Sequence, residues 1–220
     1  MLHIVYNLLL VLSYRHGDLG LVYPIARGSS PMLVAMVAAV LAGERLDAVT
    51  TLGVALVSLG ILALAFDRRG QGTFHLTPAL LTGVSIAAFS IVDGLGSRRS
   101  GNANAYAAWL FATYGPPMML TAITIRRART PRDGREPTPW RTAETLRSAC
   151  GGIVALIAYA IVIWAASVSP MGPVSALRET SVVIAALLGW LLLNEPMPPQ
   201  RLAACAVVAL GAACLGLSHA

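Results

Sequence analysis

The stretch YPIARGSSPMLVAMVAAVLAGERL, residues 23–46, decides the fold because it is long and apolar, with charge only toward its two ends. A helix rises about 1.5 Å per residue, so roughly 20 apolar residues cross the hydrocarbon of a bilayer. Backbone polar groups in lipid must be satisfied within their own segment, and this stretch lacks the alternating polarity of a membrane β-strand. It therefore predicts a membrane-spanning helix with Arg27 near one end and Glu44 near the other.

The composition of the whole chain supports lipid as the solvent. The 220 residues are 56% hydrophobic and only 12% charged, with a mean hydropathy of +0.70, whereas about a quarter of a soluble domain is charged. All 16 basic residues are arginines, and they concentrate in one segment without interleaved aromatic residues. The net charge of +6 is thus better explained by charged loops of a membrane protein than by nucleic-acid binding.

Eight apolar segments follow one another along the chain, and most approach the length of a membrane span. They are residues 2–14, 21–42, 49–66, 78–96, 105–125, 148–168, 173–193 and 201–218. The first is short, which indicates a chain truncated at its N-terminus. We predict an all-α, polytopic membrane protein with about eight transmembrane helices.

Residues of the same type recur at a constant separation of 151 positions. The pairs are Arg27 and Arg178, Ser30 and Ser181, Ala35 and Ala186, Glu44 and Glu195, Leu59 and Leu210, and Gly60 and Gly211. A gap-free register that includes charged residues and glycines indicates an internal repeat. The second and seventh segments carry the two copies, and because five steps separate them they cross the membrane in opposite directions. The repeat is therefore inverted, as in many secondary transporters.

Three motifs within this repeat resemble a known family. They are SYRHGDLGLVYPIARG at residues 13–28, GERL at residues 43–46, and SVSPMGPVSALRETSVVIAALLGWLLLNEP at residues 167–196. Together they are similar to the drug/metabolite transporter superfamily, in its EamA-type branch.

This resemblance implies a ten-helix fold built from two inverted five-helix repeats. Residues 1–66 would hold the last three helices of the first repeat, and residues 78–220 all five helices of the second. The segment RRARTPRDGREPTPWRTAETLR, residues 126–147, has seven arginines and three prolines, and we predict a basic loop there. The excess of arginine places this loop in the cytoplasm, whereas the resemblance places it outside, so the orientation stays open.

Two arginines inside apolar segments are the main candidates for a substrate site. Arg27 and Arg178 approach the membrane interior from opposite faces, and a planar guanidinium suits carboxylate or phosphate. With them we assign a polar pathway to Tyr23, Glu179, Thr180 and Ser181, and we expect Glu179 to pair with Arg27 across the helix interface. The alternative is that both arginines reach back to the membrane surface.

Other residues are predicted to couple or to shape the helices. Asp93 lies near the end of the fourth segment and is a candidate proton-coupling carboxylate; pairing with Arg98 or Arg99 is the alternative. Structural roles are assigned to Pro24, Pro31, Glu44 and Glu195, with each glutamate bonding to the N–H groups that begin the next helix along the chain. Close helix packing is assigned to Gly53, Gly60, Gly211 and Gly216.

The sequence shows no nucleophile–base pair, metal cluster or phosphate loop, so we expect neither an enzyme nor a cofactor or metal. We predict a secondary transporter, an exporter or exchanger of a small metabolite or drug, that works by alternating access. The alternatives are a non-transporting membrane scaffold and an inactive truncated relic. The expected location is the bacterial plasma (inner) membrane, with lipid and a small molecule as partners. Proton coupling and homodimer formation are left open.

Overall fold

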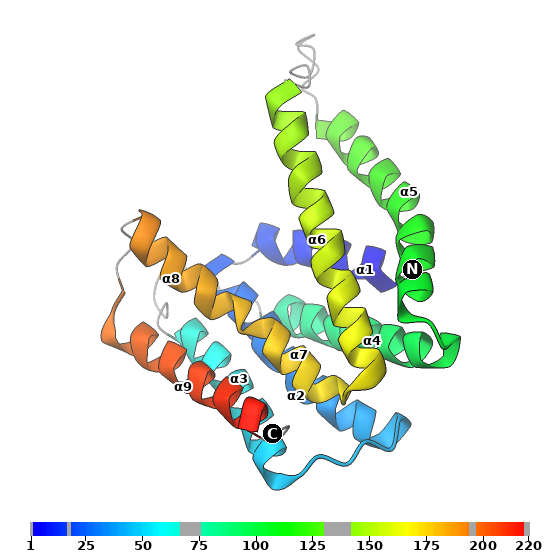
Figure 1. Cartoon of the computed structure of the whole chain (residues 1–220). Coiled ribbons are helices and arrows are strands. Elements are labelled where there is room, and N and C mark those ends of the chain that lie inside the picture. The colour runs from blue at the N-terminus through cyan, green and yellow to red at the C-terminus, as the bar shows by residue number, and fades with distance from the viewer. Residues whose placement is uncertain (1, 17–18, 67–75, 130–141, 194–196, 218–220) are drawn as a thin grey trace. The chain divides into compact units, whose positions relative to one another are not determined.

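In the computed structural model, the structure describes residues 2–16, 19–66, 76–129, 142–193 and 197–217. Every regular element in these ranges is an α-helix (Figure 1). The helices are α1 (Leu2–His16), α2 (Leu19–Leu41), α3 (Ala48–Phe66), α4 (Leu76–Ser100), α5 (Ala103–Arg129), α6 (Thr142–Val168), α7 (Met171–Glu179), α8 (Ser181–Leu193) and α9 (Pro199–Leu217). The predicted all-α class is confirmed for this part of the chain.

Five stretches of the described residues are long and apolar enough to cross a membrane. They are Pro24–Leu41, Thr77–Ser100, Leu146–Val168, Met171–Leu192 and Pro199–Leu217, and a shorter apolar helix covers Ala48–Leu64. Many large apolar side chains on these helices are exposed, including Val40, Leu191 and Leu192. In water such exposure would be costly, whereas lipid is the solvent that these side chains suit.

Two sequence predictions need correction. The segment 173–193 holds two helices, α7 and α8, but Thr180 between them keeps helical φ and ψ of −60° and −19°, and Met171–Leu192 forms one candidate span, so the turn is tightened locally without a break in the span. The basic loop is shorter than residues 126–147: α5 continues to Arg129 and α6 begins at Thr142, with residues 130–141 outside the described ranges. Arginine is a good helix former and is favoured at a helix C-terminus, so arginine content did not mark the end of α5.

The chain divides into two compact units. One comprises residues 1–95 and 168–220, and the other residues 96–167. In the second unit, the Arg98 guanidinium donates a hydrogen bond from Nε to the Ala166 carbonyl at 2.9 Å. Phe111 of α5 also contacts Tyr159 of α6, with ring centroids 6.4 Å apart.

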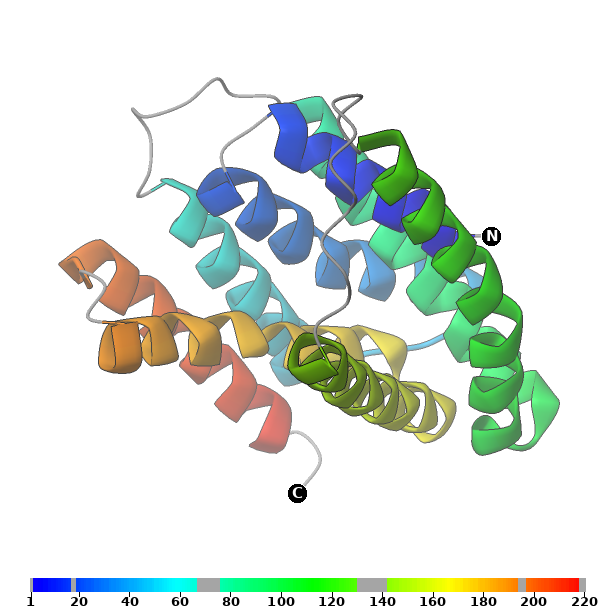
Figure 2. The ribbon, with the colours of Figure 1, turned by 90° about the horizontal axis from the view of Figure 1, so that it is seen from above.

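The helices α3 and α9 pack side by side in antiparallel directions (Figures 1 and 2). A Cβ on Gly60 would lie 2.6 Å from Val208 Cγ2 and 3.1 Å from the Ala204 carbonyl. A Cβ on Gly211 would lie 2.9 Å from Val57 Cγ2 and 2.8 Å from the carbonyl of residue 53. The two sets of contacts are related by the same 151-residue offset that the sequence contains.

Three of the four glycines predicted to allow close packing do so. Gly53, Gly60 and Gly211 lie where a side chain would meet the facing helix, because the two backbones approach closely there. The prediction for Gly216 is wrong, since a Cβ there would find nothing within 4 Å. Val57, Ile61 and Val208 fill the centre of this interface and are fully buried.

We predict that Gly60→Ala destabilises the protein by about 1–3 kcal/mol, the usual cost of overpacking a tight core. The new methyl group would press on the Val208 side chain and backbone. Thermal unfolding in detergent measures the loss. Gly216→Ala on α9 is the matched control, because its methyl group enters open space. Equal stability of both variants would contradict close packing at Gly60.

The turn between α2 and α3 ends in a capping aspartate. The Asp47 carboxylate accepts hydrogen bonds from the backbone N–H groups of Val49 at 3.1 Å and Thr50 at 3.4 Å, and another from the Thr50 hydroxyl. The hydroxyl, followed by the backbone groups, lowers the pKa of Asp47 below its ordinary value of 3.8. The first-turn N–H groups of α3 are thus satisfied by an ionised carboxylate.

This cap predicts a specific response to acid. Because the folded pKa is lowered, the stabilisation is complete above the unfolded value and is lost as pH falls through the folded one. Asp47→Asn keeps an acceptor but does not titrate, so its melting temperature should fall less than that of the native protein between neutral pH and about pH 3. Asp47→Ala should already melt lower at neutral pH. Parallel acid responses of native and Asp47→Asn proteins would argue against the cap.

Candidate functional site

Three charged side chains from two helices meet in the first unit. The Arg27 guanidinium of α2 donates from Nη1 to Oε2 of Glu179 at 3.0 Å. Arg178 of α7 donates to the other oxygen, Oε1, from Nε at 3.0 Å and from Nη2 at 2.9 Å. The Glu179 side chain is fully buried, while those of Arg27 and Arg178 are 24% and 16% exposed. The predicted pairing of Arg27 with Glu179 is confirmed.

The local chemistry of α2 allows a proline four residues after this arginine. Pro31 has no N–H, so it cannot donate to the carbonyl four residues earlier, which is that of Arg27. The Ser30 hydroxyl donates to this carbonyl at 3.3 Å instead. Pro31 and Ser30 are both buried, and α2 continues as one helix through Pro24 and Pro31. A buried backbone acceptor is thereby satisfied next to the charged cluster.

The helical segment that carries Arg178 and Glu179 tightens by one turn directly after them. At Thr180 the backbone N–H bonds to the Leu177 carbonyl, three residues back, at 3.2 Å. The Thr180 hydroxyl donates to the same carbonyl at 2.6 Å. Beyond this tight turn α8 begins at Ser181. Because Thr180 keeps helical φ and ψ of −60° and −19°, the chain continues from α7 into α8 as one span, Met171–Leu192.

The start of α7 is held by a glutamate from the other end of α2. Both Glu44 oxygens accept a hydrogen bond from the Met171 N–H, at 2.9 and 3.2 Å. Gly43, with φ of 65°, turns the chain at the end of α2 just before this contact. The prediction that Glu44 bonds to a helix N-terminus is confirmed, but the helix is α7 and not the next one along the chain. The carboxylate stabilises the positive end of the α7 dipole.

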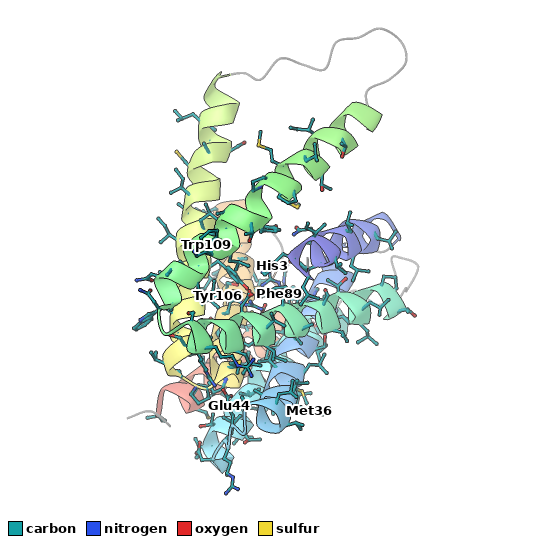
Figure 3. All side chains as sticks on the ribbon, turned by 90° about the vertical axis from the view of Figure 1, so that its right-hand side faces the viewer. His3, Met36, Glu44, Phe89, Tyr106 and Trp109 are labelled. Carbon is teal, nitrogen blue, oxygen red and sulfur yellow. The ribbon has the colours of Figure 1, made fainter. Side chains whose placement is uncertain are left out.

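Asp93 also pairs with a residue distant in sequence. His3 Nε2 of α1 lies 3.2 Å from Asp93 Oδ2 of α4. The His3 ring packs on Phe89, one helical turn before Asp93, with centroids 4.6 Å apart (Figure 3). Phe89 in turn lies under Arg178, whose guanidinium carbon is 5.9 Å from the ring centroid. A continuous series of contacts therefore connects Asp93 with the arginine cluster.

The structure says less about the other residues that the sequence predicted for the site. Tyr23 lies in α2, but its side chain is outside the described residues, as is the whole of Glu195. Pro24 is buried in α2, and Ser181 is exposed at the start of α8. Arg98, the alternative partner of Asp93, donates to the Ala166 carbonyl. Of the predicted pathway, the structure brings together Arg27, Arg178 and Glu179.

Sequence reasoning missed His3 and Phe89. Phe89 looked like one more apolar residue of its segment, and His3 lay near a chain end without ligand spacing. One signal was available: a buried carboxylate needs a partner, and His3 is the one basic side chain of residues 2–14. Among the described residues, no group of three or more His, Cys, Asp or Glu side chains could hold a metal ion.

The apolar helices with a buried charged cluster define an integral, multi-pass membrane protein. The sequence model of the EamA-like transporter family matches residues 75–217 of this chain. The chain belongs to the EamA-like transporter family, whose members are membrane transporters of small molecules. The resemblance read from the motifs is thereby confirmed.

A solved crystal structure is similar in fold. The alignment covers 97% of this chain and 74% of the other, with a TM-score of 0.71 and 20% sequence identity. At that identity the likeness shows the fold alone. None of the curated proteins matches this chain.

We predict that Glu179→Gln lowers the free energy of unfolding by about 3–5 kcal/mol, because it leaves two arginines close together without their shared carboxylate. Chemical unfolding in detergent micelles measures the loss, with the exposed Arg45→Gln as the control. Adding Arg27→Gln restores the original net charge of the cluster. The double variant should therefore lose less stability than the sum of the two single losses; simple additivity would contradict the shared carboxylate.

Proposed function

We propose that this protein is a secondary transporter that moves a small metabolite or drug across the membrane by alternating access. The observation that carries the proposal is the Arg27–Glu179–Arg178 cluster, which is buried between α2 and α7. Charges in a membrane span are costly and mark substrate pathways. In secondary transporters such groups bind substrates near the midplane, where the two halves meet.

The chemistry of the cluster favours an anionic group on the substrate. Its three side chains sum to one net positive charge, and both arginines are partly exposed. A guanidinium offers several donors in one plane, which suits a carboxylate or phosphate. We assign the pathway to Arg27, Arg178 and Glu179, with Tyr23, Thr180 and Ser181 as the further residues that the sequence places beside them.

The ten-helix inverted repeat belongs to the same proposal. In it, residues 1–66 are the last three helices of one half and residues 78–220 are the other half. The reciprocal contacts of Gly60 and Gly211 at the α3–α9 interface support this division, because two inverted copies would pack with this symmetry. We also propose the bacterial inner membrane as the location, since its spanning proteins are helical whereas outer-membrane spans are β-barrels.

The two alternative functions, a scaffold and a relic, predict a different result in a transport assay. A non-transporting scaffold or a truncated relic would fold and insert but would not carry a solute. The reconstituted chain should take up or release at least one compound from a panel of amino acids, organic acids and sugar phosphates. Absence of flux for the whole panel, with the protein verified as folded, would favour the scaffold or relic.

We predict that Arg27→Ala and Arg178→Ala each reduce transport of the substrate found in that panel by at least about tenfold, since loss of a charge-assisted contact costs about 1.5–3 kcal/mol. Initial rates in proteoliposomes, normalised to folded protein, provide the measurement. Arg45→Ala, at an exposed position after α2, should transport normally. Unchanged rates in both cluster variants would show that the arginines only anchor the helices.

A further inference from the structure

Two serine hydroxyls are enclosed in the first unit without a hydrogen-bond partner. Ser58 of α3 is fully buried and Ser175 of α7 is 4% exposed, and neither hydroxyl oxygen has a partner among the described residues. The hydroxyl of Ser90, which directly follows Phe89 on α4, is a third such group, in a residue that is only partly buried. Buried polar groups are normally hydrogen-bonded, so an exception indicates a partner that the chain itself does not supply.

Other buried serines of these packed helices are satisfied within their own helix. The hydroxyls of Ser30 in α2 and Ser85 in α4 donate to the carbonyl three residues earlier, at 3.3 and 2.7 Å. Such a carbonyl is within reach of a serine in any helical turn, which makes it the local solution where no water is present. Ser58 and Ser175 do not use it, so their hydroxyls remain available to water or a solute.

Ser58 lies next to the arginine of α2. A Cβ on Gly28, the residue after Arg27, would be 3.1 Å from the Ser58 carbonyl oxygen. Along α3, Ser58 is four residues after Val54 and three before Ile61, which places the three residues on one face of the helix. Val54 and Ile61 belong to the buried cluster that includes Ala176 of α7. Ser58 is therefore on the side of α3 that meets both α2 and α7.

Ser175 lies one helical turn before the shared carboxylate. It precedes Glu179 by four residues, which is about 6 Å along the axis of α7 and on the same face. The neighbouring Ala176 packs against α3, and a Cβ on Gly172 would be 2.9 Å from the Ala35 Cβ of α2. Both serines therefore lie where α2, α3 and α7 meet, beside the charged cluster.

We propose that Ser58 and Ser175 bind hydroxyl groups of the transported substrate, which is a hydroxylated anion of the chemistry shared by sugar acids and sugar phosphates. This inference rests on the proposed transport function and adds the class of substrate and two residues that select it. Arg27 and Arg178 hold the acidic group. The serine hydroxyls bind the uncharged part, since a serine hydroxyl and a sugar hydroxyl each donate and accept hydrogen bonds.

The burial of both serines also bears on the transport cycle. The helices enclose them in this structure, so a solute reaches the two hydroxyls only when α7 separates from α2 and α3. Alternating access supplies such a movement between helix bundles. Without solute the two hydroxyls have no partner, which favours opening of this interface to water or substrate.

The experiment measures uptake into proteoliposomes that contain the full chain, with probes that separate charge from hydroxyl groups. Gluconate and glucose 6-phosphate have both, butanesulfonate has the charge alone, and mannitol has the hydroxyl groups alone. We expect uptake of gluconate or glucose 6-phosphate, and the preferred one identifies the acidic group as carboxylate or phosphate. Butanesulfonate and mannitol should enter at least about tenfold more slowly, because each lacks one set of contacts.

Single variants test the two hydroxyls. Ser58→Ala and Ser175→Ala should each raise the KM of the transported anion about fivefold, the effect of one hydrogen bond between uncharged groups. Neither variant should lower the melting temperature in detergent, because the hydroxyl that is removed has no partner in the protein. Ser85→Ala is the matched control: it removes a buried hydroxyl that is bonded within its own helix, and its KM should equal that of the native protein.

Chemical labelling tests the same position without a rate measurement. In a chain whose three cysteines are replaced by alanine, Ser175→Cys should react with a small, membrane-impermeant methanethiosulfonate. Gluconate or glucose 6-phosphate, whichever is transported, should slow this reaction. Ala176→Cys is the matched control, because the next residue along α7 lies in the apolar cluster with Val57 and Ile61 and should stay unlabelled.

The outcomes distinguish the substrate class from the transport function. Absence of flux for these probes and for the wider panel would overturn the proposed function. Flux of other panel compounds alone, or flux of butanesulfonate or mannitol at the rate of the hydroxylated anions, would overturn the substrate class and leave transport standing. An unchanged KM in both Ser58→Ala and Ser175→Ala, or no labelling of Ser175→Cys, would show that the substrate does not contact these hydroxyls.

Discussion

The shared carboxylate of Glu179 is the interaction on which the centre of the first unit depends. A fully buried acid is tolerated only because two guanidiniums from α2 and α7 donate to its two oxygens. This requirement fixes how α7 approaches α2, and Glu44 fixes the same helix at its other end through the Met171 N–H. Between these two polar contacts, small residues such as Gly172 beside Ala35 let the helices approach.

The outer surfaces of these helices face lipid and not water, and this determines how the helices pack around the cluster. Apolar burial contributes little between helices that are surrounded by lipid, so close backbone contact and internal hydrogen bonds supply the specificity. Gly28 against α3, Gly83 against α2 and Gly60 against α9 each mark such a contact. The helices around the charged cluster are therefore held together mainly by complementary shape at these close contacts.

Much of this framework could be predicted from the sequence, because lipid forces long apolar segments to be helical. The Arg27–Glu179 contact was also accessible, since an intramembrane charge needs a partner at a similar depth. The tightened turn at Thr180 was not, because no glycine or proline marks it and apolar residues lie on both sides of it. The His3–Asp93 contact joins helices 90 residues apart in sequence, and residue types alone do not choose among the partners that such a carboxylate could find.

In the register of the proposed repeat, with its offset of 151 residues, Gly28 is the position equivalent to Glu179. A side chain at Gly28 would press on Leu62 and the backbone of α3, so that position has no room for a second acid. In the repeat that we propose, the two copies therefore differ where their chemistry lies: both contain the arginine, and one supplies the carboxylate for both. The symmetry proposed for the helices does not extend to their charges.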